Sequence, residues 1–413
     1  MRDLATTQLR PQRVPLVAFI TANTISAVGN VFTTIAVPWF VLQTTGSATR
    51  AGITGAVTAL SFIASFFGGT FVDRIGHKRV AVASDLGSGV MVALVPLLYH
   101  TVGLAFWQLL ALVFLRALLA SPGNAARYGL RPGLIALADA SKERANSIME
   151  GVRNSALVVG TGIAGLLIAV IGTANMLWLD GASFLISATL IWLAVPASAG
   201  AIASVSTKSR YWRDLAEGWR FFTGDRVLLA VTVAAIATNF AIAAQTTVLL
   251  PVYARQVFGS AVSLGLLNGG VLAGTVVGTA LYAVFAPRLP RRGTLIGGLF
   301  LSCTGIGLLV PLPPLPLAVA AMALQGLGLG PLNPIVASVD QERVPTALRG
   351  RVMGMIFALA TVANPVASLL AGLLVGRFGL GLGIAVIAAT VFGWTGWVAT
   401  NPSLRRMNAP KES

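Results

Sequence analysis

Long apolar runs alternate with short polar or Pro/Gly-rich breaks along the whole chain. A helix needs about 20 mostly apolar residues to cross the hydrocarbon core of a bilayer. Reading between the breaks predicts six such helices in the first half of the chain, near residues 15–42, 48–71, 80–99, 103–121, 149–171 and 175–195. Six more are predicted in the second half, near residues 227–250, 262–286, 294–310, 317–338, 352–375 and 381–399. The pattern therefore predicts an all-α membrane protein with twelve transmembrane helices.

The longest break between apolar runs covers residues 197–226. It is rich in Ala and Ser and then becomes YWRDLAEGWRFFTGDR, which mixes aromatic with charged residues. Such a segment is typical of an amphipathic helix that lies on a membrane surface. We therefore predict a six-helix bundle over 1–196, a cytoplasmic linker with an amphipathic helix over 197–226, and a second six-helix bundle over 227–413.

The composition agrees with a chain that has lipid as its solvent. Hydrophobic residues make up 56% of the 413 residues and charged residues only 10%, whereas soluble domains carry about 25% charged residues. The mean hydropathy is +0.82. The basic N-terminus is followed by an apolar run from about 15 to 42, which is too long for the core of a cleaved signal peptide and is predicted to be the first span.

The formal charge of +16 first suggests a nucleic-acid partner, but its distribution favours a membrane. With both termini in the cytoplasm, 25 of the 29 Lys and Arg residues fall in cytoplasmic segments, three fall in outer loops, and Arg116 lies inside a span. This asymmetry is the positive-inside bias of membrane proteins. The basic residues are spread over seven inner segments, where they face anionic lipid. We expect a bacterial inner-membrane protein that binds lipid and no nucleic acid.

The two halves of the chain carry matching segments. Residues 37–52, VPWFVLQTTGSATRAG, pair without gaps with residues 250–265, LPVYARQVFGSAVSLG, at an offset of 213. Further on the offset becomes 207, and AGLL at 164–167 meets AGLL at 371–374. Six spans have therefore been duplicated in parallel. Two similar bundles in a pseudo-twofold arrangement around a central cavity suit alternating access, in which one bundle rocks against the other.

Charge is concentrated in GGTFVDRIGHKRV, residues 68–80, between the second and third spans. Taken alone, the stretch is a solvated cytoplasmic loop that obeys the positive-inside bias. It also resembles the signature G-x-x-x-D-R-x-G-R-R/K of the major facilitator superfamily, and the matching residues are Gly69, Asp73, Arg74, Gly76, Lys78 and Arg79. The resemblance implies a cytoplasmic latch between the two halves. Asp73 would then meet the start of the eleventh span near Gly350 and Arg351.

Other segments extend the resemblance over nearly the whole chain. FLRALLASPG (114–123) is similar to the family's signature in the fourth span, and VVGTGIAGLL (158–167) to the exporter signature G-P-x-x-G-G in the fifth, although Thr161 replaces its proline. Together with LDGASFLISA (179–188) and QERVPTALRGRVMG (341–354), these segments resemble the bacterial drug:proton antiporter branch that includes macrolide and siderophore exporters. The resemblance implies a monomeric secondary exporter that moves lipophilic or amphipathic small molecules outward against protons.

Alternative functions remain open at this stage. SPGNAARYG (121–129) and ANSIME (145–150) resemble the lysophospholipid transporter branch, so a flippase of the same fold is the second hypothesis. A membrane receptor or scaffold without transport, and an importer of sugars or amino acids, are further possibilities. Lipid-dependent transport without protons would favour the flippase.

Charged residues inside a membrane are costly, so each is a candidate for coupling transport to protons. The candidates are Arg116, Asp180, Asp85 and Glu150. Each also has a structural interpretation. Arg116 can bind carbonyls at a helix crossing, Asp85 can pair with arginines of a nearby loop, and Glu150 can pair with Arg153 one turn away. Asp180 suits either role.

Neutral polar residues inside spans are candidates for the cargo cavity. They are Asn23, Asn30, Asn239, Gln245, Asn268, Asn333 and Asn364. Asn30 stands where many relatives of the branch carry Asp. Some of these amides can instead join helices by hydrogen bonds. A cavity with few charges and a largely apolar wall suits lipophilic or amphipathic cargo.

The sequence contains little that indicates an enzyme. It has no G-x-x-x-x-G-K-[ST] loop for ATP, and two histidines and one cysteine, Cys303, provide no set of ligands for a metal. We therefore expect neither enzymatic activity nor a cofactor or metal.

Overall fold

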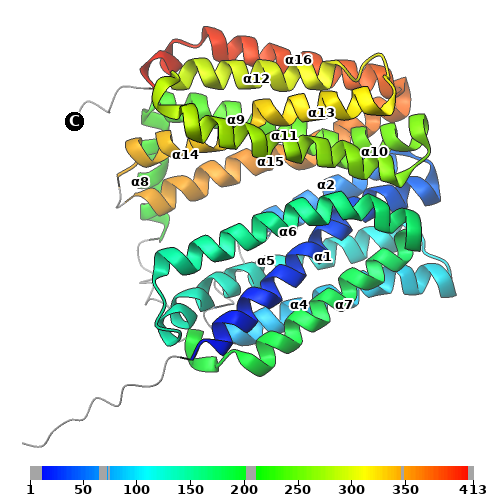
Figure 1. Ribbon diagram of the computed structural model, residues 1–413, viewed down its shortest axis with the longest axis vertical. Coiled ribbons are helices and arrows are strands. Elements are labelled where there is room, and N and C mark those ends of the chain that lie inside the picture. Colours follow the sequence, from blue (N-terminus) through cyan, green and yellow to red (C-terminus); the bar gives the residue numbers. More distant parts are fainter. Residues whose placement is uncertain (1–11, 65–71, 73–74, 201–210, 346–347, 408–413) are drawn as a thin grey trace, which may run out of the picture. The chain divides into compact units, whose positions relative to one another are not determined.

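The computed structural model describes residues 12–64, 72, 75–200, 211–345 and 348–407, and every regular element in these ranges is helical (Figure 1). The first half contains α1 (Val14–Thr45), α2 (Ala48–Ala64), α4 (His77–Thr101), α5 (Phe106–Leu137), α6 (Lys142–Ile171), α7 (Thr173–Ala194) and the short η2 (Ala197–Gly200). The second half begins with α8 (Tyr211–Gly224), α9 (Arg226–Ala244), the π-turn η4 (Gln245–Leu249), α10 (Leu250–Tyr253) and the π-turn η5 (Ala254–Phe258). It continues with α11 (Ala261–Phe285), η6 (Ala286–Arg288), α12 (Arg291–Gly307), α13 (Leu315–Leu329), α14 (Leu332–Arg343), α15 (Arg349–Phe378), α16 (Leu380–Thr400) and η7 (Pro402–Arg406).

Ten helical segments in the described ranges are long and apolar enough to cross a membrane. Two of them combine several elements, because α9 to η5 form one segment over Arg226–Phe258 and α13 to α14 form another over Leu315–Arg343. The other two predicted spans correspond to α2 and α12, which comprise 17 residues each in this part of the chain. The chain is thus an all-helical, multi-pass membrane protein, and the count of twelve spans stays a prediction.

Helix α5 is longer than the sequence pattern suggested. The fourth span was expected to end near residue 121, but α5 continues to Leu137 through Pro122 and Pro132. Neighbouring helices and side chains can satisfy the backbone groups that a proline leaves free in a membrane helix. Arg127 and Arg131, expected in a cytoplasmic loop, therefore lie on this helix instead.

The amphipathic segment of the predicted linker forms α8. Its apolar face packs on protein and not only on a lipid surface, because Phe222 is buried in a cluster with Leu228 of α9 and Val352 of α15. Gly218 allows the close approach, since an added Cβ would lie 3.3 Å from the Cβ of Arg351. The helix therefore packs on α9 and α15, and the expectation that it lies on the membrane surface stays a prediction.

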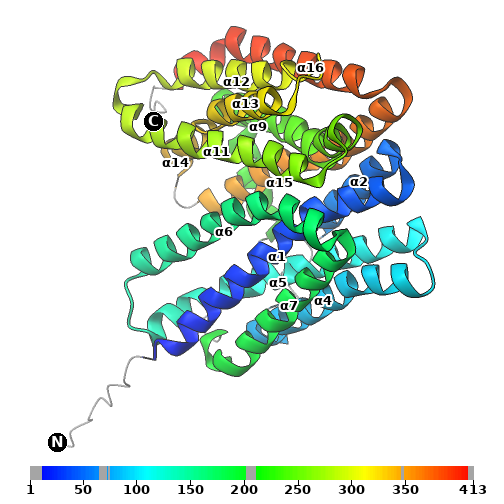
Figure 2. The same ribbon diagram turned by 45° about the vertical axis from the view of Figure 1, so that its right-hand side comes forward.

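The first of two compact units comprises Met1–Thr33, Ala64–Gly160 and Leu177–Val205. Within it α4 packs along α5, and α1 and α7 lie beside them (Figure 2). Its core is formed by fully buried apolar side chains, among them Phe19, Leu130 and Ile191.

The second compact unit comprises Thr34–Ile63, Thr161–Met176 and Ser206–Ser413. Within it α11 packs on α13, α12 on α13 and α16, and α15 on α9 and α16. Helices α11 and α13 approach at backbone distance, because an added Cβ at Gly274 would lie 2.8 Å from the backbone nitrogen of Leu327. The units divide α1 and α6, so they do not follow the predicted halves, and the boundaries at 196 and 227 stay predictions.

A buried ion pair secures the start of α9. The Oδ1 atom of Asp225 accepts hydrogen bonds from the backbone nitrogens of Val227, at 2.9 Å, and Leu228, at 3.2 Å. The Nη1 atom of Arg343 lies 3.2 Å from the Oδ2 atom of Asp225, and both side chains are buried. Asp225 thus caps the helix and compensates a buried guanidinium.

We predict that Asp225→Ala strongly destabilises the second unit. Loss of the cap costs about 1 kcal/mol, and removal of one member of a buried ion pair costs about 3–5 kcal/mol. Thermal unfolding of the detergent-solubilised protein measures the effect. Asp225→Asn, which keeps a cap acceptor, should be intermediate, and Glu342→Gln, which removes an exposed partner of Arg291, should change little. An unchanged midpoint for Asp225→Ala would contradict this assignment.

Candidate functional site

The first unit contains a charged cluster centred on Arg116 of α5. Its Nη2 atom donates a 2.6 Å hydrogen bond to the Oδ1 atom of Asn30 on α1. The same nitrogen lies 3.5 Å from the Oδ2 atom of Asp180 on α7. The side chain of Arg116 is 12% exposed and that of Asp180 is 0% exposed. Two of the coupling candidates and one of the cavity candidates therefore meet in one buried site.

The carboxylate of Asp180 is held mainly by hydroxyl groups. Thr33 of α1 donates to its Oδ2 atom. Ser183 on the same helix shares its hydroxyl hydrogen between the backbone carbonyl of Asp180, at 2.7 Å, and the Oδ1 atom, at 3.2 Å. Gly29 makes room for this contact, because an added Cβ there would overlap the side chains of both Asp180 and Ser183. The sequence Gly29-Asn30 thus provides space for the carboxylate of Asp180 at Gly29 and a hydrogen-bond acceptor for Arg116 at Asn30.

The hydrogen bonds around Arg116 and Asp180 do not fully compensate their two buried charges. Within the described residues the Nε atom of Arg116 is buried without a hydrogen-bond partner. The guanidinium also lies 5.5 Å from the centre of the Phe184 ring, in cation–π contact. A buried ion pair offsets its desolvation only when the geometry is close and the remaining groups are paired. A change in the charge of Asp180 therefore alters the energy of the whole cluster.

A second buried ion pair lies on the same helix. The Nη2 atom of Arg127 contacts both oxygens of Asp85 on α4, with a distance of 2.5 Å to Oδ2. Ser187 of α7 donates to the same carboxylate at 2.8 Å, and Arg127 also reaches the hydroxyl of Ser26 at 3.5 Å. Asp85 thus has the arginine partner that its structural interpretation expected, from α5 instead of a loop.

Helical spacing aligns the two ion pairs. Arg116 and Arg127 are eleven residues apart, which is about three turns or 16.5 Å on one face of α5. Asn30 and Ser26, one turn apart on α1, contact Arg116 and Arg127 respectively. Sequence reasoning missed Arg127, although polar residues recur at spacings of three and four at 26, 30 and 33 on α1 and at 180, 183 and 187 on α7. These two polar stripes on α1 and α7 were the signal in the sequence that pointed to a buried charged partner such as Arg127.

The fourth coupling candidate, Glu150, lies apart from both pairs. It forms an ion pair with Arg153 at 2.9 Å, as the structural interpretation expected, and lies 3.7 Å from Arg131. Its side chain is 42% exposed. Water screens such a pair, so Glu150 is a poor site for storing a coupling charge.

Part of the predicted latch lies outside the described residues. Gly69, Asp73 and Arg74 fall there, so the expected contact of Asp73 is untested. Gly76 precedes α4 with a φ of 97°, a conformation that favours glycine. The Nζ atom of Lys78 lies 5.2 Å from the centre of the Trp192 ring, Arg79 is exposed, and Gly350 lies in the first turn of α15. Arg351 forms an ion pair with Glu217 of α8 at 3.3 Å.

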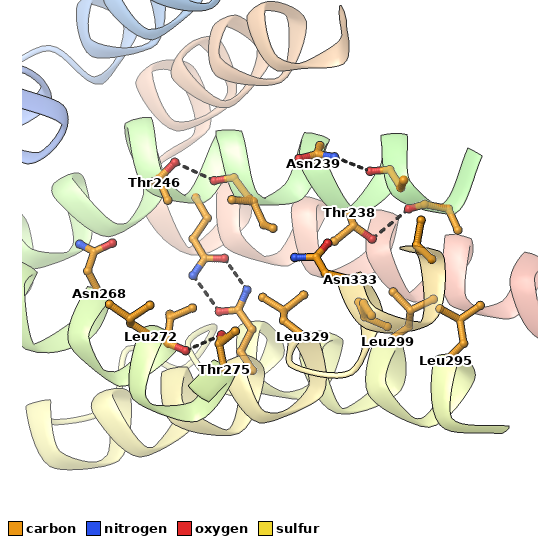
Figure 3. Close-up of a pocket in the computed structure, with 18 of the residues that line it drawn as sticks. Thr238, Asn239, Thr246, Asn268, Leu272, Thr275, Leu295, Leu299, Leu329 and Asn333 are labelled. Carbon is orange, nitrogen blue, oxygen red and sulfur yellow. Dashed lines mark hydrogen bonds between the residues drawn. The ribbon is translucent and has the colours of Figure 1, made fainter. Parts of the chain in front are cut away.

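A neutral pocket of about 380 Å³ lies within the second unit (Figure 3). Its wall is formed by α9, η4, α11, α12, α13 and α14, with Thr161 contributed by α6. The described residues that line it include no Asp, Glu, Lys, Arg or His. The lining combines Leu, Val, Ile and Ala side chains with amides and threonines. A pocket of this kind offers a largely apolar surface with a few directional hydrogen-bonding groups.

Four of the seven cavity candidates line this pocket: Asn239, Gln245, Asn268 and Asn333. The other three do not. Asn30 joins the charged cluster, Asn23 is half-buried on α1, and the Oδ1 atom of Asn364 on α15 is buried with no hydrogen-bond partner among the described residues.

Gln325, which is not among the candidates from the sequence, pairs with Gln245 in the wall of the pocket. The Nε2 atom of Gln245 donates to Oε1 of Gln325 at 2.7 Å, and Nε2 of Gln325 donates to Oε1 of Gln245 at 2.6 Å. Both side chains are almost fully buried. The segment around Gln325, QGLGLGPLNP (325–334), is rich in glycine, a composition typical of close helix packing. A glutamine inside that apolar run was the signal for a buried partner.

A known protein family matches this chain along nearly its whole length. A family model described as the Major Facilitator Superfamily matches residues 19–286 and 257–413. The multidrug efflux pump Tap of Mycobacterium tuberculosis is 34% identical over 401 residues, which cover 96% of this chain and 95% of that protein. The macrolide efflux protein A of Streptococcus pyogenes is 20% identical over 86% of this chain and 88% of that protein.

Solved structures agree on the fold. The crystal structure of the nucleoside transporter NupG matches with a TM-score of 0.76 and 11% sequence identity, over 96% of this chain and 99% of that chain. A bacterial homologue of the human lysosomal transporter Spinster, inward-facing and unoccupied, matches with a TM-score of 0.75 and 13% identity, over 98% and 99%. At these identities the likeness concerns the fold alone.

We predict that the pair of Asp85 and Arg127 stabilises the first unit only as a pair. Asp85→Leu alone should lower the free energy of unfolding by about 3–5 kcal/mol, because a buried guanidinium loses its counterion. The double variant Asp85→Leu/Arg127→Met should recover most of this loss. Thermal unfolding of all four proteins in one detergent measures the coupling. If the double variant lost as much as both single variants together, the ion pair would not be the source of the effect.

Proposed function

Because the chain belongs to the major facilitator superfamily, we propose that it is a secondary exporter of lipophilic or amphipathic small molecules, driven by inward proton flow. Its place is the bacterial inner membrane, with both termini in the cytoplasm. The relatives named as drug and macrolide efflux proteins support this cargo class. The observation that carries the proposal is the buried ion pair of Arg116 and Asp180. The pocket of the second unit, in contrast, has only neutral side chains among its described lining residues.

Asp180 is the group we assign to the proton. It is fully buried and lies 3.5 Å from Arg116, whereas Asp85 is in direct contact with Arg127. A carboxylate with this looser compensation gains more from neutralisation than one in a tight pair. When Asp180 takes up a proton, it releases Arg116, which keeps its hydrogen bond to Asn30 and its contact with the Phe184 ring. The energy available is about 2.3 kcal/mol per charge per 100 mV of membrane potential.

The neutral pocket of the second unit is the proposed cargo site. Its apolar wall can take up a lipophilic molecule, and its amides can orient that molecule. Protons and cargo would then use different groups. Coupling between them requires that the two sites respond to the same conformational change.

The proposal includes twelve spans in two halves related by a pseudo-twofold axis. Two glycine crossings within the second unit support it. An added Cβ at Gly52 of α2 would lie 2.8 Å from the Cα of Gly372 on α15, and one at Gly165 of α6 would lie 2.8 Å from the Cα of Gly265 on α11. The sequence repeat equates Gly52 with Gly265 at the offset of 213, and Gly165 with Gly372 at the offset of 207. The contact of Gly52 with Gly372 and the contact of Gly265 with Gly165 are therefore equivalent contacts, one from each half of the repeat.

The cytoplasmic latch remains part of the proposal on the strength of the family signature. Arg351, its expected partner for Asp73, is held by Glu217 of α8. We further propose that the exporter works as a monomer in contact with lipid and needs no cofactor. Alternating access between two halves then moves the cargo outward.

We predict that Asp180→Asn and Arg116→Ala abolish transport driven by a pH gradient. In proteoliposomes with an imposed gradient, wild type should move a lipophilic fluorescent dye, and both variants should fall to the level of empty liposomes. Asp180→Asn keeps the size of the side chain and removes only its charge. Glu150→Gln, which removes an exposed carboxylate, is the matched control and should transport like wild type.

Two results would contradict the proposal. Undiminished gradient-driven transport by Asp180→Asn would show that the proton uses another group. If wild type moved no dye under the gradient but still transferred labelled lysophospholipid, the exporter proposal would fail and the flippase hypothesis would replace it.

A further inference from the structure

Asp340 on α14 is a buried acid that neither the proposed proton site nor the proposed cargo site uses. The residue is 2% exposed. Within the described part of the chain, no hydrogen bond or ion pair reaches its carboxylate. The other buried acids among the described residues, Asp85, Asp180 and Asp225, each have an arginine partner. An isolated carboxylate is so costly to remove from water that the group takes up a proton instead.

The charged residues around Asp340 are either paired with other groups or exposed. Helix α14 packs on α9, α12 and α13. The charged residues on these helices and at their ends are Asp225, Arg226, Arg291, Arg292, Glu342 and Arg343. Arg343 pairs with Asp225, and Arg291 pairs with Glu342 at 2.6 Å. Arg292 donates to the carbonyl of Ala399 at 2.6 Å, and Arg226 is exposed. None of these described groups compensates a charge on Asp340.

Asp340 lies on a helix that forms part of the pocket wall. Asn333 (Figure 3) and Val336 of α14 line the pocket. Asp340 comes four residues after Val336 and seven after Asn333, so the three residues lie on one face of the helix. It is about 6 Å beyond Val336 along the helix axis. This direction leads to the end of α14 that is predicted to face the cytoplasm.

The two ends of α14 are held in different ways. Gly330 and Pro331 separate the helix from α13. At this break the hydroxyl of Thr279 on α11 donates to the carbonyl of Gly330 at 3.0 Å, and the backbone of α11 leaves no room for a Cβ at Gly330. Backbone packing thus fixes this end, whereas ion pairs of Glu342 and Arg343 hold the other. The C-terminal end of α14 can therefore move while the break stays in place.

We propose that Asp340 is a proton-operated switch for the packing of α14. At low cytoplasmic pH its carboxyl group is neutral, and α14 stays packed on α9 and α12. As the cytoplasmic pH rises, the O–H bond breaks, water takes the proton, and the electron pair stays on the carboxylate. The carboxylate requires hydration, so the C-terminal end of α14 moves away from its neighbours. Asn333 and Val336 move with the helix, which widens this end of the pocket.

The inference rests on the proposed function for its role, because it assigns a regulation to the proposed cargo pocket. A raised cytoplasmic pH would favour the state in which cargo enters from the cytoplasm. The switch is distinct from proton coupling at Asp180, since Asp340 exchanges its proton with the cytoplasm and not with the cargo. It can therefore be tested without cargo and without a proton gradient.

Infrared spectroscopy of the detergent-solubilised protein detects a protonated carboxyl group directly, because its C=O stretch is separate from the bands of a carboxylate. At mildly acidic pH, the difference spectrum of wild type and Asp340→Asn should contain this band, and the band should be lost as the pH rises. Asp340→Leu removes the same carboxyl group and should give the same result. Glu342→Gln is the matched control, because Glu342 is exposed and ionised in its pair with Arg291 two residues further along the helix. Its difference spectrum should lack the band.

Hydrogen–deuterium exchange of the backbone amides of α14 measures its packing. In wild type, the exchange rate relative to the intrinsic rate should rise about 10-fold or more as the infrared band disappears, because the ionised carboxylate needs water that the packed helix excludes. Asp340→Asn and Asp340→Leu are neutral at every pH, so this rise should be absent in both. Glu342→Gln should behave like wild type.

Two outcomes would overturn the proposal. Identical infrared spectra of wild type and Asp340→Asn would show that Asp340 is ionised in the packed state. A rise in exchange with pH that persists in both Asp340 variants would show that another group controls α14. If wild type shows the switch but lacks gradient-driven transport, the proposed export function fails and the assignment of Asp340 stands.

Discussion

The ion pair between Arg116 and Asp180 places two charges where neither could remain alone. A single charged side chain in the centre of a membrane helix costs at least about 2.5 kcal/mol, and more when it is kept from water. The surrounding residues reflect that constraint. Gly29 leaves space for the carboxylate, Thr33 and Ser183 donate hydroxyls to it, and Asn30 holds the guanidinium. The packing of α1, α5 and α7 in the first unit is therefore organised around one pair of charges.

The same constraint accounts for the contrast between the two units. In the first unit, Asp85 and Arg127 repeat the ion pair three turns along α5, with closer contacts and two serines around it. In the second unit, the pocket carries amides and hydroxyls without a charged side chain among its described lining residues. A neutral wall avoids the cost of burying charge and leaves hydrogen bonding and apolar contact to recognise a ligand. Proton transfer can thus use the charged residues of the first unit, and cargo recognition can use the neutral residues of the second.

Much of this organisation could be predicted from the sequence. The apolar runs predicted an all-helical membrane protein, and the cost of intramembrane charge selected Arg116 and Asp180 before any geometry was known. Their pairing could not be predicted, because nothing in the spacing of residues 116 and 180 indicates which helices face each other. Arg127 was missed because Pro122 suggested the end of a helix that in fact continues to Leu137. Gln325 was missed because its glycine-rich surroundings drew attention to helix packing and not to the amide itself.

The central claim is that cargo binding and the protonation of Asp180 are linked, and proton release measures that link directly. The detergent-solubilised protein is mixed with a lipophilic cationic dye in weakly buffered solution containing a pH indicator. If the claim holds, binding of the dye to wild type changes the number of bound protons, and Asp180→Asn binds the dye with no such change. If Asp180→Asn released as many protons as wild type at equal dye occupancy, Asp180 would not be the coupling group, and the buried pair would be structural only.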